Sequence, residues 1–310
     1  MNSERKVILF KVEAPAGTDA VPVGATDAFQ AIDFKWGNAG KANTDQFDYA
    51  SPYYGARDVF NVAMQRDCSF DIPVIGGSAP LGTNYPAALL ALYRACGHAA
   101  VETPATSVVF SPISNGEETG SLYAHEDTIR RKMLYSRGSM KWLWTENKVP
   151  RCTVALQGLY STPTDTAIIV PTFPTLEKPV GFGKGNTIVT LGALALKSSM
   201  VELDGGRTNA YRRLSSGEDI VPTDLKPKLK IKFELPTVAQ KAVYTELETT
   251  LDQAFSIVHG TVAGNIFTAA APRAQLVNIS EEKDRTRLFV TADLELLPSS
   301  SGVPYTLTLT

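Results

Sequence analysis

The sequence contains little that covalent or metal chemistry could use. Its 310 residues include only three histidines and three cysteines, the latter at positions 68, 96 and 152. Their number is odd and their spacing wide, which fits neither a disulfide framework nor a CxxC metal motif, and no HExxH motif is present. These absences argue against a disulfide-stapled fold, a metal site and a bound cofactor. They predict reduced, buried thiols in a protein made in a cytosol.

An excess of charge of one sign is also lacking. Lys and Arg number 30 against 32 Asp and Glu, which gives a formal net charge of -2, and only 20% of residues are charged. This balance excludes a basic nucleic-acid clamp and an acidic disordered tail. No apolar run approaches the roughly 18 residues that a membrane helix needs, so we expect no membrane partner.

What the sequence does have is a succession of short segments rich in Val, Ile, Thr, Phe and Tyr, separated by Gly, Pro, Asn and Ser. In residues 68–74, apolar and polar side chains alternate, which is the period of a strand with one buried face. The predicted fold is therefore mainly β. The predicted strands are 31–36, 68–75, 107–110, 151–160, 187–191, 200–203, 228–235, 276–279, 287–296 and 303–309.

Two segments predict a substantial helix, and each follows a predicted strand. Residues 85–96 have Pro86 in the first turn and Gly97 directly after the last residue, which are typical start and stop signals. Residues 237–255 place apolar side chains at four-residue steps, including Leu247 and Leu251. The sequence therefore predicts one helix in each half of the chain.

The two halves repeat the same order of elements, which indicates an internal duplication. Residues 31–41 align with 198–208 at an offset of 167, Phe70 aligns with Phe233 at an offset of 163, and Arg151 aligns with Arg287 at an offset of 136. The falling offset gives the first half a little under 30 extra residues, which we place at 114–148. The prediction is two tandem β-barrel or β-sandwich domains with one flanking helix each, at 1–165 and 187–310, joined by a Pro/Gly-rich linker at 166–186.

Few segments resemble a catalytic or ligand-binding motif. Residues 77–83 have the glycine spacing of a phosphate-binding loop but lack its lysine, which favours a structural turn. Cys96 and His98 are close in sequence, but no third group that would orient them is visible, so a cysteine hydrolase is the weakest interpretation. Residues 129–144 mix aromatic and basic side chains, as single-strand binding surfaces do. Because Trp142 and Trp144 share one strand face, we favour packing or a subunit contact for them instead.

A further set of segments resembles the phage tail tube (major tail) proteins. Residues 11–22, KVEAPAGTDAVP, are similar to the N-terminal element of that family, in which a glutamate leads through a Gly-Thr-Asp turn and a proline to the first barrel strand. The resemblance covers 11–165 well and the second half loosely. It continues, in the family's order, through Gly76-Gly77, 86–97, 110–114, Leu122-Tyr123, Val149-Pro150, 157–160 and 163–165.

The resemblance implies a structural virion protein, not an enzyme, whose rings stack into the hollow conduit for double-stranded DNA. Many tail tube proteins have one domain and assemble as hexamers, whereas this longer chain would close a pseudo-hexameric ring with three copies. Ring closure pairs the sheet edges that would otherwise aggregate. The implied partners are further copies, the tail terminator, the tape measure and baseplate or tip proteins. The implied location is the virion tail, after assembly in the bacterial host cytoplasm.

A channel that DNA crosses should be polar and not strongly positive, because a lysine-lined bore would hold phosphates. We predict that the polar faces of the repeated strands line it, through Asp33, Lys35, Ser69, Asp71, Glu202, Asp204, Lys230, Lys232 and Glu234. The segment 37–65 is predicted to reach the next ring through Asn43, Asp45, Tyr49, Tyr53, Tyr54 and Arg57. The alternative is a β-sandwich adhesin or a capsid or tail decoration protein, in which the linker separates two independent domains.

Overall fold

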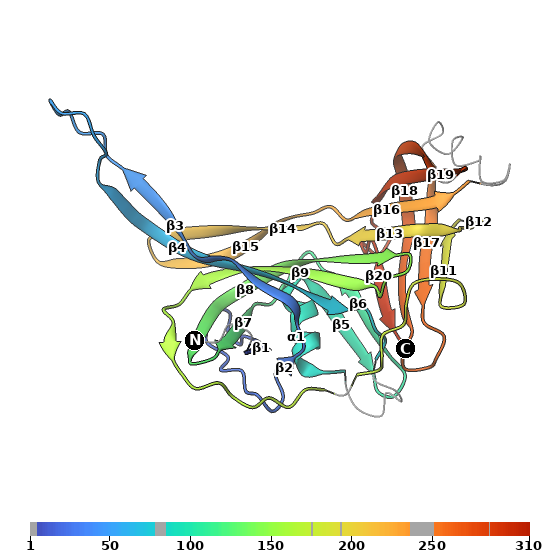
Figure 1. Cartoon of the computed structure of the whole chain (residues 1–310), viewed down its shortest axis with the longest axis horizontal. Helices are drawn as coiled ribbons and strands as arrows, with labels where there is room; N and C mark the ends of the chain where they lie inside the picture. Colours follow the sequence, from blue (N-terminus) through green and yellow to red (C-terminus); the bar gives the residue numbers. More distant parts are fainter. Residues whose placement is uncertain (1–4, 78–84, 175, 193, 236–250, 285) are drawn as a thin grey trace.

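Antiparallel strands make up most of the computed structural model, which describes residues 5–310 apart from 78–84, 175, 193, 236–250 and 285 (Figure 1). This confirms the mainly-β prediction. The first elements are β1 (Lys6–Val12), β2 (Ala28–Phe29), β3 (Ile32–Gln46), β4 (Val59–Pro73), α1 (Ala87–Ala95), β5 (His98–Thr103), β6 (Ser107–Pro112), β7 (Gly120–Glu126), β8 (Ile129–Thr145), β9 (Arg151–Tyr160) and β10 (Thr164–Asp165). They are followed by β11 (Thr187–Leu191), β12 (Leu194–Ala195), β13 (Ser198–Asp204), β14 (Arg207–Leu214), β15 (Gly217–Leu225), β16 (Lys228–Glu234), β17 (Asp252–His259), β18 (Phe267–Asp284), β19 (Arg287–Leu296) and β20 (Thr306–Leu309).

Two four-stranded sets form the central sheet. In the first half the order across the sheet is β3-β4-β9-β8, and in the second half it is β13-β16-β19-β18. The C-terminal part of β8 pairs antiparallel with β13, from Lys141 opposite Asp204 to Thr145 opposite Met200. The two sets therefore form one continuous sheet of eight strands.

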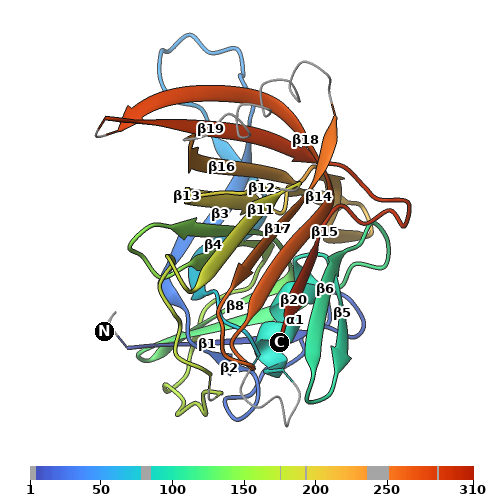
Figure 2. The same ribbon diagram turned by 90° about the vertical axis from the view of Figure 1, so that its right-hand side faces the viewer.

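Smaller strands extend each set in the same way. In the first half, β7 pairs with the beginning of β8, β1 pairs with β7, and β2 pairs with β1. In the second half, β17 pairs with the beginning of β18, β11 with β17, and β12 with β11. The last strand, β20, pairs with both β18 and β6, which ties the β5–β6 hairpin of the first half to the second half (Figure 2).

One hydrophobic core runs through both halves. Strand alternation puts Phe70 and Val154 of the first half in the same buried cluster as Val201 and Ile231 of the second. Residues 166–186 contain no strand among those described, and they are tied to the first half by backbone hydrogen bonds such as Thr172 N–H to the Gly24 carbonyl (2.8 Å). The core therefore does not divide at this segment.

The helices follow the sequence prediction only in part. Helix α1 occupies Ala87–Ala95 within the predicted 85–96, and Gly97 follows it with φ +78°, a left-handed conformation that glycine adopts without strain. Of the second predicted helix, 237–255, residues 237–250 lie outside the described part. The helix prediction is wrong for Leu251, which has no regular structure, and for 252–255, which begin β17: this stretch pairs with β18 on one side and, from the buried Phe255 onward, with β11 on the other. No helix in the described part of the chain has the length and apolarity to cross a bilayer.

Two hairpins leave the central sheet at corresponding places. The distal parts of β3 and β4 continue beyond their neighbours and project from the molecule with the loop 47–58 at the end (Figure 1). We call this hairpin, 38–64, the arm, residues 38–46 and 59–64 its stem, and 47–58 its tip. Strands β14 and β15, which come between β13 and β16 in the sequence, form a separate two-stranded sheet. This hairpin packs against β8 and β9.

Candidate assembly interface

The nine residues predicted to line a channel all lie on β3, β4, β13 and β16, and none of them is in the core. They alternate along their strands with buried side chains such as Phe70, Val201 and Ile231. They therefore share the face of the central sheet that points away from the core, which we call the polar face. That this face lines a channel stays a prediction.

Ion pairs connect strands across the polar face. Lys141 of β8 lies 2.7 Å from the carboxylate of Glu202 on the adjacent β13, and Arg151 of β9 lies 3.5 Å from that of Asp71 on the adjacent β4 and 3.3 Å from that of Asp33 one strand further away, on β3. The nine predicted residues contain five acids and three bases, and their ion-pair partners bring the balance to seven acids and six bases. These partners are Lys141, Arg151, Arg287, Glu282 and Asp293. Because carboxylates hold most of its cations, this face offers little attraction to phosphates.

Trp142 and Trp144 lie at the junction where β8 meets β13. Trp142 is opposite Leu203 and Trp144 is opposite Val201. Both indole side chains are completely buried, and Trp142 also contacts the ring of Tyr305. The prediction of a contact with another subunit is therefore wrong for these two side chains, because the core shared by the two halves encloses them.

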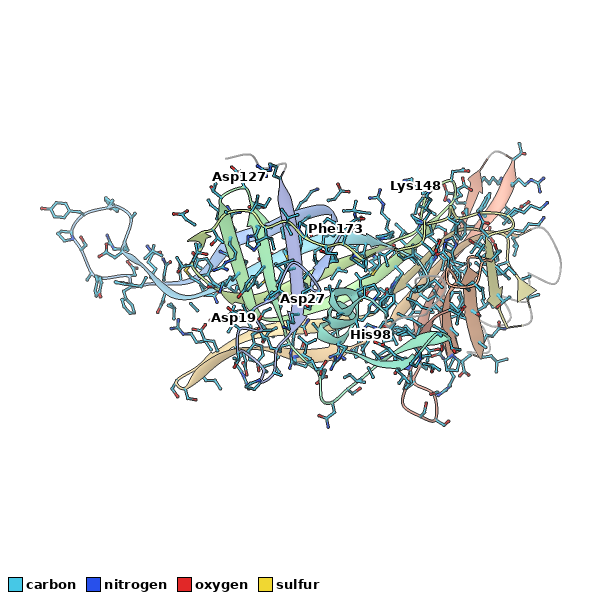
Figure 3. All side chains as sticks on the ribbon, turned by 90° about the horizontal axis from the view of Figure 1, so that it is seen from below. Asp19, Asp27, His98, Asp127, Lys148 and Phe173 are labelled. Atoms are coloured by element: carbon cyan, nitrogen blue, oxygen red, sulfur yellow. The ribbon has the colours of Figure 1, made fainter. Side chains whose placement is uncertain are left out.

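The residues predicted to reach a neighbouring ring lie on the arm. Asn43 and Asp45 are on its stem, and the others are on the tip, where the side chains of Tyr53 and Tyr54 are almost entirely exposed (79% and 107%). Figure 3 shows the tip side chains standing clear of the rest of the molecule. Exposed aromatic groups gathered in one place are typical of a contact surface. The identity of what they contact stays a prediction.

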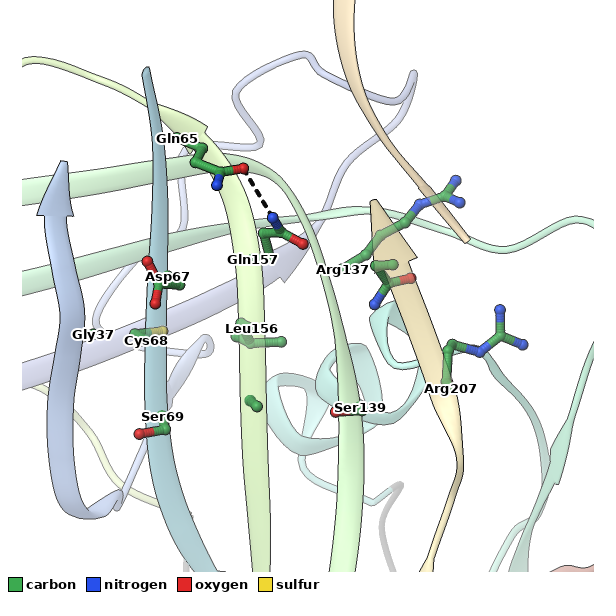
Figure 4. Close-up of a pocket in the computed structure, with 12 residues that line it drawn as sticks. Gly37, Gln65, Asp67, Cys68, Ser69, Arg137, Ser139, Leu156, Gln157 and Arg207 are labelled. Carbon is green, nitrogen blue, oxygen red and sulfur yellow. Dashed lines mark hydrogen bonds between the residues drawn. The ribbon is translucent and has the colours of Figure 1, made fainter. Parts of the chain in front are cut away.

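Sequence reasoning missed a hollow of about 360 Å³ over β4, β9 and β8 (Figure 4). Its wall includes the amide pair Gln157 and Gln65, in which Gln157 Nε2 donates a hydrogen bond to Gln65 Oε1 (2.9 Å). Arg207 and Asn209 of β14 form the opposite side. The beginning of β14, the first strand of the β14–β15 hairpin, thus borders a hollow on the first half of the chain.

Arg207 anchors this hairpin. Its side chain is buried, and the guanidinium donates hydrogen bonds to the Glu117 carboxylate (3.1 Å) and to the carbonyl oxygens of Gly97 (3.4 Å) and Ile113. All three acceptors belong to the first half. A single arginine in a charged, polar stretch of sequence carries no signal for such an anchor, because its partners are about a hundred residues away.

The glutamate of the N-terminal motif has a structural role. The Glu13 carboxylate is buried and accepts hydrogen bonds from the hydroxyl groups of Thr119 (2.7 Å) and Ser121 (2.8 Å) and from the backbone N–H groups of Gly17 (2.7 Å) and Tyr135 (2.9 Å). Buried carboxylates require such compensation. The motif therefore fixes the N-terminal turn against the β7–β8 hairpin.

Asp19 of the same motif forms a second link to this hairpin. Its carboxylate accepts hydrogen bonds from the Tyr123 hydroxyl (2.5 Å) and from Lys132 Nζ (2.8 Å). Burial by itself would raise the pKa of Asp19, but the hydrogen bonds from Lys132 and Tyr123 outweigh it and lower that pKa below its ordinary value. Asp19 is therefore ionised at neutral pH.

Cys96 and His98 are both enclosed in the core. Burial raises the pKa of Cys96 to about 12 and lowers the pKa of His98 to about 4, so both groups are neutral at pH 7. His98 Nε2 shares a hydrogen bond with the Tyr305 hydroxyl (2.9 Å), and Nδ1 lies 3.2 Å from the Tyr93 carbonyl oxygen. The imidazole of His98 therefore connects the first half, through Tyr93, with the second half, through Tyr305. The predicted turn at 77–83 lies outside the described residues except for Gly77.

Comparison with known proteins gives no family assignment. No protein-family model matches the sequence, and no curated protein matches it. The function proposed below therefore rests on the resemblance given above and on the geometry of the sheet.

Proposed function

We propose that this protein is the subunit of a phage tail tube, which closes into rings with two further copies and stacks into a conduit for double-stranded DNA. The observation that carries the proposal is the junction between β8 and β13, where two four-stranded sets of the same construction meet edge to edge. The remaining ends of the eight-stranded sheet are β3 and β18. The free strands β18 and β3 are the counterparts of the joined strands β8 and β13. A subunit that closes into a ring requires two such complementary edges.

Strand register supports the internal repeat. Phe70 lies opposite Val154 in the first half, and Phe233 lies opposite Val290 in the second. These are the residues that the sequence offsets of 163 and 136 align with each other. Strands β1, β2, β3, β4, β7, β8 and β9 then have β11, β12, β13, β16, β17, β18 and β19 as their counterparts.

The repeat also changes where the extra residues of the first half are placed. Strands β7 and β8 occupy most of 114–148, and they are the counterparts of β17 and β18, so this segment is not an insertion. The surplus lies earlier, because 46 residues separate β4 from β7 whereas 17 separate β16 from β17. The difference of 29 agrees with the surplus expected from the offsets, and the β5–β6 hairpin falls within it.

Ring closure follows from the junction. On the side of β18 away from β19, β17 covers only the first part of the strand, as far as Gln275, and no further described strand lies along it; β20 pairs with β18 on the same side as β19. Strand β3 pairs only with β4 among the described strands. We propose that the end of β18 pairs with β3 of the next copy as β8 pairs with β13. This removes two exposed strand edges from each subunit.

The size of such a ring suits DNA. Three copies contribute 24 strands, which at a spacing of about 4.8 Å and a tilt of about 36° give a circumference of roughly 145 Å and a backbone diameter of about 46 Å. Inward side chains leave a bore of roughly 35 Å, wider than a duplex of about 20 Å. The near-neutral polar face then lines a bore that DNA crosses without being held.

The remaining parts of the proposal follow from the tube. Its ends require a tail terminator and baseplate or tip proteins, and its bore holds a tape measure protein before DNA passes. The protein is then a component of the virion tail that is assembled in the host cytoplasm, with no catalytic role. Tip residues Tyr49, Tyr53, Tyr54 and Arg57 are proposed to contact the adjacent ring.

Electron microscopy of concentrated purified protein tests this function. We expect hollow rings or tubes with three chains per layer. Rings of six chains would contradict the duplication, and discrete particles with no central bore would favour the alternative, an adhesin or a capsid or tail decoration protein. That alternative expects two independent domains, whereas one hydrophobic cluster and one continuous sheet extend across both halves.

A further inference from the structure

Strands from both halves form a second layer on the far side of the core from the central sheet. Pairing places them in the order β11-β17-β18-β20-β6, in which only the first part of β18 takes part. We call this layer the outer sheet. One of its faces carries core side chains such as Val189 and Leu307, and Phe267 on it contacts Trp144 of the central sheet. The other face points away from the molecule, and we call it the outer face.

The outer face lacks charge over most of its area. Strands β11, β20 and β6, residues 253–259 of β17 and residues 267–272 of β18 contain no Asp, Glu, Lys or Arg, although 20% of the residues in the chain are charged. The side chains that alternate there with core residues are mostly small or β-branched: Ile188, Thr190, Ser256, Val258, Thr268, Ala270, Thr306, Thr308 and Val109. Because charged residues are depleted at the centres of protein interfaces, this face has the composition of a contact surface.

The corresponding face of the first half is covered by the chain itself. Strands β1 and β7 are the counterparts of β11 and β17. Their side chains Val7, Leu9 and Tyr123 form a small buried cluster of their own, against which Ile168 of the Pro/Gly-rich linker packs. On β11, by contrast, the side chain of Ile188 is 63% exposed. The second half therefore presents, uncovered in the single chain, a face that the first half buries under an irregular segment.

The outer face and the tip of the arm lie at opposite ends of the molecule. Figure 1 places the arm at one end of the longest axis and the outer sheet at the other, and Figure 2 looks onto β11, β17, β20 and β6 from that second end. The arm continues β3 and β4, so in a ring whose strands are tilted by about 36° it projects mainly along the tube. Rings that stack with one polarity bring the tip of each subunit to the opposite end of a subunit in the next ring.

Each chain has one free arm and one uncovered outer face. The β14–β15 hairpin follows β13 as the arm follows the first part of β3, but it packs against β8 and β9 of its own chain. The linker likewise covers the outward side of β1 and β7. A ring of three subunits would therefore offer three tips at one end and three outer faces at the other.

We propose that the tip of the arm docks on the outer face of a subunit in the adjacent ring. This rests on the proposed tube function and names the surface of the second copy that receives the tip. Tyr49, Tyr53 and Tyr54 are 61%, 79% and 107% exposed in the single chain. Docking would remove their rings from water without burying a charge of the outer face. Because the core separates the outer face from the polar face, the docked tip stays outside the bore.

Cross-linking within assembled tubes tests the docking. A chain that carries both Tyr54→Cys and Ile188→Cys is assembled and treated with a short bismaleimide, and the native thiols at 68, 96 and 152 are buried. The two introduced thiols lie at opposite ends of one chain, so a cross-link must join two copies. We expect a ladder of covalently joined chains on a denaturing gel. The matched control pairs Tyr54→Cys with Val277→Cys, a 54% exposed position that shares a hollow with Lys230 and Asp293 of the polar face, and should give at least tenfold less product.

A charge placed on the outer face gives a second test. Ile188→Glu should change the unfolding midpoint by less than about 1 °C, because the side chain is exposed, and should shorten the tubes at least severalfold, because docking would bury an unpaired carboxylate. Ile188→Thr, which keeps a neutral β-branched side chain, is the control and should stack normally. Tubes of normal length from Ile188→Glu would overturn the docking.

Microscopy of the cross-linked sample separates this proposal from the tube function. Tubes with the expected ladder support both. Tubes whose ladder is no stronger than that of the Val277→Cys control would overturn the docking of the tip on the outer face and leave the tube function standing. Absence of rings and tubes would overturn both.

Discussion

Trp142 lies directly opposite Leu203 in the antiparallel pair of β8 with β13, and both side chains are buried. One residue belongs to each half of the chain, so the indole of Trp142 is held by a core that neither half completes alone. If β18 and β3 pair between copies as proposed, the contact between Trp142 and Leu203 is the example, within one chain, of the contacts expected between two copies.

Replacement of Trp142 by alanine should lower the free energy of unfolding by about 3–5 kcal/mol, because it leaves a large cavity in the shared core. The matched control is Leu143→Ala, whose side chain is 37% exposed and points to the opposite face, with an expected loss below about 1 kcal/mol. Urea unfolding followed by circular dichroism measures both. Two separate transitions, with only one affected by Trp142→Ala, would contradict a core shared by the halves.

The buried imidazole of His98 should make stability depend on pH. Burial lowers its pKa from 6.5 to about 4 in the folded protein, so the unfolded chain binds the proton more readily between these values. Stability present above pH 6.5 should therefore fall by up to about 3 kcal/mol as the pH approaches 4 and change no further through this group below that. His98→Gln should be less stable at pH 7 but lose less stability on acidification. Equal losses in the two proteins would refute this origin.

The exposed tyrosines of the tip should determine stacking without affecting the fold. Tyr53→Ala combined with Tyr54→Ala removes two rings that contribute little to the single chain, so the unfolding midpoint should change by less than about 1 °C. We expect rings to form but tubes to shorten at least severalfold in electron micrographs. Val262→Ala, at another exposed apolar position, is the control. Normal tubes from the double variant would show that the tip does not join rings.

The charge of the polar face should control how freely DNA passes. Asp33→Lys together with Glu202→Lys changes the charge by four units per chain and by twelve per ring of three, and it leaves Arg151 and Lys141 without these partners. Assembled tubes of this variant should retain double-stranded DNA at low salt and release it as salt rises. Asp165→Lys, on β10, adds charge away from this face and should have no such effect. Equal DNA retention by both variants would place the polar face outside the bore.

Much of the fold could be predicted from local pattern. Alternation identified most strands of the central sheet, and the cap signals around Pro86 and Gly97 located α1 within two residues. The helical spacing of apolar residues at 237–255 gave a wrong prediction for residues 252–255. Phe255 and Ile257 fit strand alternation as well, and the pairing with β11 and β18 makes this stretch a strand. On the proposed repeat, the extra residues fall between β4 and β7 instead of at 114–148, because an offset gives the number of extra residues without their position.

The candidate interface was predicted less completely. The polar face followed from alternation, since residues between buried positions of a strand must point the other way. The junction of β8 with β13, the Arg207 anchor and the hollow over β4, β9 and β8 each join residues tens to more than a hundred positions apart, and no local pattern contains them.

The sequence by itself determined that this chain is rich in strands, which side of each strand is polar, and which segments of the halves resemble each other, because these depend on residues next to one another along the chain. Only the tertiary structure decided that the halves share a core, that Trp142 belongs inside it, and that β3 and the distal part of β18 are the edges of the central eight-stranded sheet. Edges and neighbours of a sheet are set by pairing between distant strands, which many registers of the same local pattern would permit.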